Sequence, residues 1–162
     1  MDELIDLMKS TERQYISLAD NPVPGLAVNI RSVRDELPHV EGMALPGDLK
    51  KFWSAWSSVT LFEDGDYGQW GLHFFSVADS RRTTERERSD RPSDFLSSDL
   101  VLAEFLGDLE LLVMDRSGTS EKMLIALPLE SRAHWPVVGD SLTDFLNRYV
   151  GSLGRKIWES SG

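Results

Sequence analysis

Apolar residues recur at helical spacing in three stretches of the chain, which predicts three amphipathic helices. The first follows Asp2, a candidate N-cap, and ends before Pro22, because proline lacks the backbone donor that a helix interior uses. The second is expected to have Pro46 as its first residue, and the third follows the candidate N-cap Ser141. The faces expected to be buried in the last two helices are Leu49, Phe52, Trp53 and Trp56, and Leu142, Phe145, Leu146, Tyr149, Val150 and Leu153.

Two further helices are predicted from their end signals. A short helix is expected from Asn29 to about Glu36, with Pro38 ending it. Ser76 and Asp79, three residues later, form a start similar to a capping box, which predicts a polar helix that runs to about Arg91.

Runs rich in branched and aromatic residues predict strands between these helices. They are Gln69–Phe75, Leu100–Phe105, Leu109–Asp115 and Lys122–Leu127. The second and third runs flank Gly107 and Asp108, a turn that suits an antiparallel hairpin. Because short turns rather than repeated crossover helices join the strands, we expect an α+β domain with a mostly antiparallel sheet covered by helices.

The composition is that of a single acidic domain. The chain has 162 residues, and its 41% hydrophobic and 27% charged residues are the balance of a globular protein. It contains no cysteine, and its acidic start, Met1-Asp2-Glu3, differs from a secretory signal, so we expect a soluble cytoplasmic protein. The net charge of −10 opposes binding to nucleic acid and to anionic membranes and favours a basic protein partner, although solubility alone also explains it.

Residue patterns that serve catalysis are scarce in the sequence. The histidines His39, His73 and His134 lie in different segments without metal-ligand spacing. Neither a Gly-x-Ser-x-Gly elbow nor a phosphate-binding loop is present. We therefore expect no enzyme activity, catalytic residue, metal site or cofactor, and keep an uncharacterised hydrolase as an alternative.

Five arginines fall between Asp79 and Asp94, a pattern that also occurs in nucleic-acid-binding segments. Five acidic residues lie in the same stretch, so the stretch is locally neutral. Ion pairs along a solvated helix are therefore the preferred interpretation.

Four pieces of sequence occur in an order and spacing that a known family shares. They are Leu45-Pro46-x-Asp48-Leu49-x-x-Phe52-Trp53, Trp70-Gly71-Leu72-His73-Phe74, Gly107-Asp108-Leu109-x-Leu111-Leu112-Val113-Met114-Asp115 and Ser141-Leu142-x-Asp144-Phe145-Leu146. Through them the chain resembles the SUKH superfamily, the Smi/Knr-type domains. The resemblance implies a single Smi/Knr-like domain over residues 1–162, with 1–39 as an N-terminal helical elaboration and 40–153 as the family-like core.

The resemblance also implies a function. Many bacterial members are cytoplasmic immunity proteins that neutralise a cognate toxin of a polymorphic or contact-dependent system, and fungal relatives act in cell-wall and signalling regulation. An immunity protein that occludes a toxin is therefore the first expectation. A regulatory or scaffold domain that binds a cellular protein, without enzyme activity, is the alternative.

Two acidic clusters are the candidate partner-binding residues. They are Glu63, Asp64 and Asp66 with Tyr67 and Trp70, and Glu104, Asp108 and Glu110 around the hairpin turn. Glu104 is expected to face away from Ala103 and Phe105, because side chains alternate along a strand. If the clusters share one face, they form an acidic patch with an aromatic edge that suits a basic toxin domain. The alternative is an ordinary solvated loop and an ordinary hairpin tip.

Overall fold

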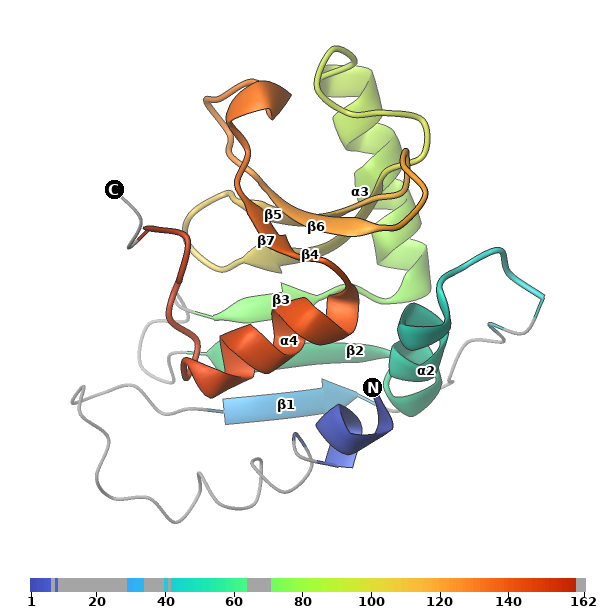
Figure 1. Ribbon diagram of the computed structural model, residues 1–162, viewed down its shortest axis with the longest axis vertical. Coiled ribbons are helices and arrows are strands. Elements are labelled where there is room, and N and C mark those ends of the chain that lie inside the picture. The colour runs from blue at the N-terminus through green and yellow to red at the C-terminus, as the bar shows by residue number, and fades with distance from the viewer. Residues whose placement is uncertain (7, 9–28, 34–39, 41, 64–70, 160–162) are drawn as a thin grey trace.

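The computed structural model describes residues 1–6, 8, 29–33, 40, 42–63 and 71–159, with only the backbone for 29–33. Its described strands form a seven-stranded antiparallel sheet in which each strand pairs with the next along the chain (Figure 1). The strands are β1 (Asn29–Val33), β2 (Ser58–Glu63), β3 (Leu72–Phe74), β4 (Leu100–Phe105), β5 (Leu111–Asp115), β6 (Lys122–Ala126) and β7 (Val137–Gly139). The helices are α2 (Gly47–Ala55), α3 (Val77–Asp90), α4 (Leu142–Gly151) and the 3-10 helix η1 (Arg132–His134), and residues 2–6 and 8, in the predicted first helix, are also helical. The α+β class and the antiparallel sheet are confirmed.

Strands β4, β5 and β6 are buried on both faces. Successive side chains point to opposite faces of a strand, so neighbouring buried residues belong to different faces. In β6, Met123 and Ile125 belong to one hydrophobic cluster, whereas Leu124 and Ala126 belong to another. Each face of the sheet therefore has its own cover.

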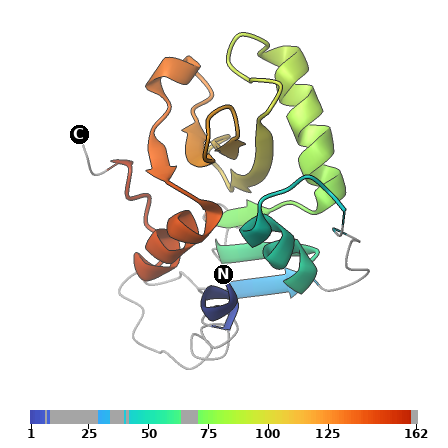
Figure 2. The ribbon, with the colours of Figure 1, turned by 45° about the vertical axis from the view of Figure 1, so that its right-hand side comes forward.

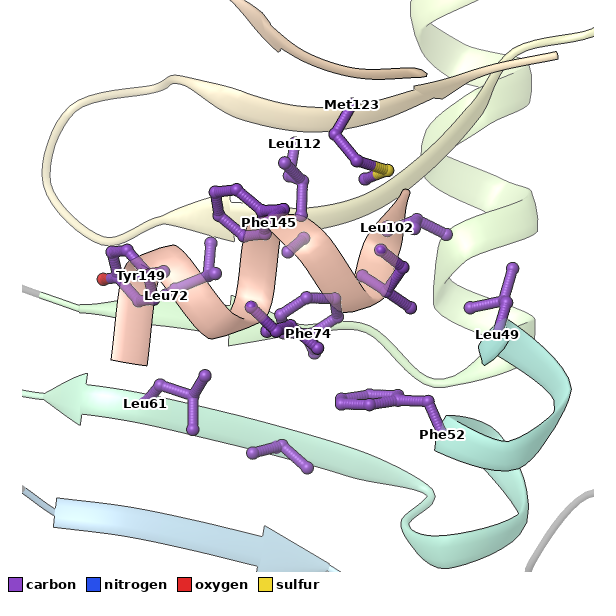
Figure 3. Packing of buried hydrophobic residues seen from close by; sticks show 14 of the residues in the cluster. Leu49, Phe52, Leu61, Leu72, Phe74, Leu102, Leu112, Met123, Phe145 and Tyr149 are labelled. Atoms are coloured by element: carbon purple, nitrogen blue, oxygen red, sulfur yellow. The ribbon is translucent and has the colours of Figure 1, made fainter. Parts of the chain in front are cut away.

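Helices α2 and α4 cover the face with the larger cluster. Figure 3 shows Phe52 of α2 and Phe145 of α4 pointing into this cluster, which Leu61 of β2 also joins. The rings of Phe145 and Tyr149 stack with their centres 5.6 Å apart. The predicted burial is confirmed for Leu49, Phe52, Trp53, Trp56, Leu142, Phe145, Leu146, Tyr149 and Val150.

The start of α2 differs by one residue from the prediction. The helix begins at Gly47, and Pro46 is its N-cap rather than its first residue. A carboxylate oxygen of Asp48 accepts a hydrogen bond from the backbone N–H of Thr143 at 3.1 Å. This bond joins the first turns of α2 and α4.

Helix α4 starts as predicted but ends earlier. The Ser141 hydroxyl accepts a hydrogen bond from the Asp144 N–H at 3.0 Å and so caps the helix. The helix ends at Gly151, and Leu153 lies beyond it with half of its surface exposed. The prediction that Leu153 is buried on the helix face is therefore wrong, because the helix ends two residues before it although the apolar spacing continues.

The polar helix α3 completes the backbone pairing of β4. Its predicted cap is confirmed, because the Ser76 hydroxyl accepts the Asp79 N–H at 3.2 Å. Strand β3 is too short to pair with the start of β4. There the Ser80 hydroxyl donates to the Val101 carbonyl at 2.6 Å, and the Val101 N–H donates to the Thr84 hydroxyl at 2.9 Å.

The first part of the sheet corrects one prediction. The segment predicted as a helix from Asn29 to about Glu36 contains strand β1, which pairs with β2. Ile30 and Val33 are β-branched and favour strands, and the neighbouring strand supplies the hydrogen bonds. The predicted helix end near Pro22 lies outside the described residues.

The hairpin of β4 and β5 and the strand β6 are confirmed, with β5 starting at Leu111. The strand predicted from Gln69 starts at Leu72 within the described residues. The sequence patterns predict neither β2 nor β7. Four consecutive buried residues of β2, 59–62, hide the alternation that marks a half-buried strand.

Candidate functional site

The predicted acidic residues divide between described and undescribed parts of the chain. Those outside the described residues are Asp64, Asp66, Tyr67 and Trp70. Those described are Glu63, Glu104, Asp108 and Glu110. In an antiparallel meander, the end of β2, the start of β3 and the β4–β5 turn lie at the same end of the sheet (left in Figure 1). We call Glu63, Gly71 and the turn residues 106–110 the acidic end of the sheet.

Gly71 joins the end of β2 to the β4–β5 turn. Its carbonyl accepts a hydrogen bond from the Leu106 N–H at 2.9 Å. Its φ is +113°, and a Cβ at this position would lie 2.6 Å from the Leu61 carbonyl oxygen and 2.9 Å from the Glu63 Cα. Only glycine tolerates this conformation and this approach, so backbone contacts hold Glu63 beside the turn.

The β4–β5 turn presents its acidic residues on an ordered backbone. The Phe105 N–H donates to the Glu110 carbonyl at 2.9 Å, and the Asp108 N–H donates to the Phe105 carbonyl at 3.3 Å. Gly107 and Leu109 both have positive φ, and 81% of Leu109 is exposed. The turn therefore projects from the end of the sheet.

Lys156 binds both carboxylates of this turn. Its Nζ lies 2.5 Å from Asp108 Oδ2 and 2.6 Å from Glu110 Oε2, and 5.3 Å from the centre of the Phe105 ring. The Lys156 and Glu110 side chains are mostly buried, whereas 53% of the Asp108 side chain is exposed. Burial disfavours the charged lysine, but the hydrogen bonds and negative charge of Asp108 and Glu110 outweigh it and raise the pKa of Lys156. We call these three residues the Lys156 clasp.

Glu104 belongs to the opposite face of the sheet. It faces away from Ala103 and Phe105, as predicted, since both of these belong to the larger cluster. In the strand register it lies between His73 of β3 and Leu111 of β5. Glu110 precedes Leu111 and binds Lys156, whose Nζ lies over the Phe105 ring on the other face of the sheet. The structure therefore does not bring Glu104 together with Asp108 and Glu110.

A second group of charges lies around Arg132 and was not predicted. The Arg132 guanidinium binds the fully buried Asp99 through two hydrogen bonds of 2.6 and 3.1 Å and Asp115 at 2.9 Å. The backbone N–H of Arg132 donates to Asp94, which also binds Arg91 at 3.0 Å. We call these five residues the Arg132 network.

Contacts within the network shift the pKa values of its own ionisable groups. Hydrogen bonding by the Arg132 backbone lowers the pKa of Asp94. Burial tends to raise the pKa of Asp115, but hydrogen bonds from Ser117 and Arg132 outweigh it, so this pKa is also lowered. Burial opposes the charge of Arg132, yet Asp99 and Asp115 raise its pKa. All of these shifts favour the charged forms that hold the network together.

The arginines of α3 and its C-cap divide between two roles. Arg82 pairs with Asp79 on the helix surface, as predicted for a solvated helix. Arg88 instead donates to the carbonyls of residues 96, 97 and 99, and Arg91 donates to the carbonyls of Leu127 and Glu130. The Arg88 bonds hold the loop after α3 on the helix, and the Arg91 bonds hold the end of the helix against the segment that leads to η1, at the upper end of the molecule in Figure 2.

A hollow lies beside α2. It is an open depression of about 550 Å³ whose lining includes Ile5, Val40 and Ala55 with Lys50 and Lys51. Lys51 is paired with Asp2 at 2.8 Å. Apolar residues form much of its lining, and the few polar groups do not converge on one point, so it is not a candidate ligand site.

Metal and membrane sites were sought in the same residues. The described part of the chain contains no group of three or more His, Asp or Glu residues that is placed to hold a metal ion. Among the described helices, none has the length and apolar character needed to cross a membrane. Comparison of the chain with protein-family models, curated proteins and solved structures finds no match.

Proposed function

We propose that this chain is a non-catalytic binding protein of the immunity type, which neutralises a basic toxin domain of a polymorphic or contact-dependent system by occluding it. The observation that carries the proposal is the acidic end of the sheet. Gly71 holds Glu63 next to the turn that carries Asp108 and Glu110, so acidic residues far apart in the sequence meet in one region. The resemblance to SUKH domains supports the same function.

The electrostatics of the acidic end suit a basic partner. Asp108 is half exposed on a projecting turn, next to the exposed Leu109. The sequence adds Asp64 and Asp66, one and three positions after Glu63, and the whole chain has a net charge of −10. Complementary charge raises the rate of encounter, and an apolar residue such as Leu109 supplies area that a partner buries.

A regulatory or scaffold domain that docks on a cellular protein is the second candidate, because it would use the same surface. The identity of the partner separates the two. The tagged protein is captured from its own host, and bound proteins are identified by mass spectrometry. A stoichiometric partner with a toxin domain, whose expression is lethal unless this chain is present, supports the immunity function. A housekeeping partner supports the scaffold function.

The docking surface is tested by association kinetics with the captured partner. Asp66→Lys with Asp108→Lys should slow association about tenfold at low ionic strength and little at about 0.5 M salt. The control, Glu85→Lys with Asp90→Lys, changes the net charge equally on α3, on the opposite side of the molecule (Figure 1). Equal slowing by both double variants would contradict docking at the acidic end.

A further inference from the structure

The segment Ser152–Glu159, which we call the strap, folds from α4 back onto the acidic end. Leu153 and Gly154 have φ values of +58° and +79°, and the Gly154 N–H donates to the Tyr149 carbonyl at 3.0 Å. A Cβ on Gly154 would lie 2.7 Å from Cγ of Phe62. The reversal after α4 therefore depends on glycine and directs the strap toward the ends of β2 and β4.

Two side chains two positions apart attach the strap to the turn. Lys156 lies between Asp108 and Glu110 in the Lys156 clasp. The Trp158 ring packs edge-on against Phe105 with ring centres 5.1 Å apart. A cation followed at the second position by an aromatic residue is thus the pattern that this surface binds.

The contacts between the strap and the β4–β5 turn leave one buried donor unsatisfied and some side-chain surface exposed. Trp158 Nε1 is buried without a hydrogen-bond partner, the one such side-chain atom among the described residues. A buried donor without an acceptor destabilises the docked arrangement, because it loses water and gains nothing in return. Half of Leu153 and half of the Asp108 side chain remain exposed.

We propose that the strap is an internal substitute for the partner: it occupies the docking site at the β4–β5 turn, and a partner segment with a lysine or arginine two residues before an aromatic residue displaces it. This inference rests on the proposed function, since it names the part of the acidic end that the partner contacts. The bound strap identifies the chemistry of the occupant, which an acidic turn alone would not do.

The test uses the full chain and a probe peptide with the sequence of residues 152–159, labelled with a fluorophore. Lys156→Gln with Trp158→Ala detaches the strap, and binding is followed by fluorescence anisotropy. The double variant should bind the probe at least about tenfold more tightly than the wild type, in which the tethered strap competes at high effective concentration. Adding Asp108→Asn and Glu110→Gln should abolish the gain.

Two controls keep the result decisive. A probe with glutamine in place of its lysine should not bind, and Lys122→Gln, which breaks the exposed pair of Lys122 with Asp140, should leave probe affinity at the wild-type value. If the double variant loses its fold by circular dichroism, Lys156→Gln alone is used, with a smaller expected gain.

No gain in affinity, or a gain that the turn carboxylates do not affect, overturns the proposal. Dimers that form by exchange of the strap between two copies also overturn it.

Failure of this inference and failure of the proposed function give different results. Probe binding that depends on Asp108 and Glu110, without a basic partner in the host, supports the strap and overturns the immunity function. A captured basic partner whose affinity is unchanged when the strap is detached supports the function and overturns the strap.

Discussion

Arg132 and Lys156 each lie between two carboxylates, but the Arg132 network and the Lys156 clasp are built differently. Arg132 reaches Asp99, which is fully buried, and its bonds join the loop after α3, the end of β5 and η1. The clasp joins one turn to one strap, and its Asp108 is half exposed. An arginine that satisfies a buried carboxylate is costly to remove, whereas a lysine on a detachable segment leaves carboxylates that water can reach.

Loss of the Arg132 side chain should have the largest effect on stability. Arg132→Ala leaves Asp99 buried without its cation, which should lower the free energy of unfolding by about 3–5 kcal/mol. Urea denaturation measures the loss. Arg82→Ala removes an exposed pair on α3 and should cost less than about 1 kcal/mol. A loss below about 1 kcal/mol for Arg132→Ala would show that the network is no stronger than a surface pair.

Substitution of Gly71 tests whether the acidic end itself is rigid. Gly71→Ala places a Cβ 2.6 Å from the Leu61 carbonyl oxygen at a φ of +113°, and should cost about 2–3 kcal/mol. Gly118→Ala is the matched control, because the nearest atom to its Cβ is 3.6 Å away. Thermal unfolding of both variants gives the comparison. Equal stability of the two would mean that Glu63 and the β4–β5 turn are not tightly coupled.

Local signals in the sequence were sufficient for much of the sheet and its covering helices. Serine caps at 76 and 141 and the apolar stripes of α2 and α4 depend on residues within one or two turns, so their pattern is readable. The sequence predicts a helix where strand β1 forms, because the hydrogen bonds of this strand come from β2, about 30 residues away. The three residues of β7 are too few for any periodic pattern.

The candidate site was predictable only in part. The Gly107-Asp108 turn and the outward direction of Glu104 follow from local rules, and both are confirmed. Lys156 lies 48 and 46 positions from Asp108 and Glu110, so no spacing rule connects them. Arg132 and Asp99 are similarly 33 positions apart. Ion pairs between distant elements depend on the finished fold.

Removal of the Lys156 charge should cost less than either change above. Lys156→Gln should lower the free energy of unfolding by about 1 kcal/mol, because the strap can detach and let water reach Asp108 and Glu110. Amide hydrogen exchange should then be faster in the strap and unchanged in β5. A loss as large as that of Arg132→Ala, or faster exchange throughout the sheet, would show that the strap is part of the core.

The Lys156 clasp and the Arg132 network should also respond to opposite ends of the pH scale, through Lys156 and Asp115, with the smallest effect on stability. The pKa of Lys156 is raised above the ordinary lysine value of 10.5, so the stability it contributes is complete below that value and lost as pH rises through the folded-state pKa. The lowered pKa of Asp115 gives the reverse: its contribution is present above the ordinary value of 3.8 and lost as pH falls through the folded-state pKa.

The stability difference between wild type and Lys156→Gln, measured by urea denaturation, should therefore shrink above about pH 10.5. The corresponding difference for Arg132→Ala should stay nearly constant there, because arginine keeps its charge. A wild-type advantage over Lys156→Gln that persists at high pH would mean that packing of the strap, rather than the charge of its lysine, holds it on the turn.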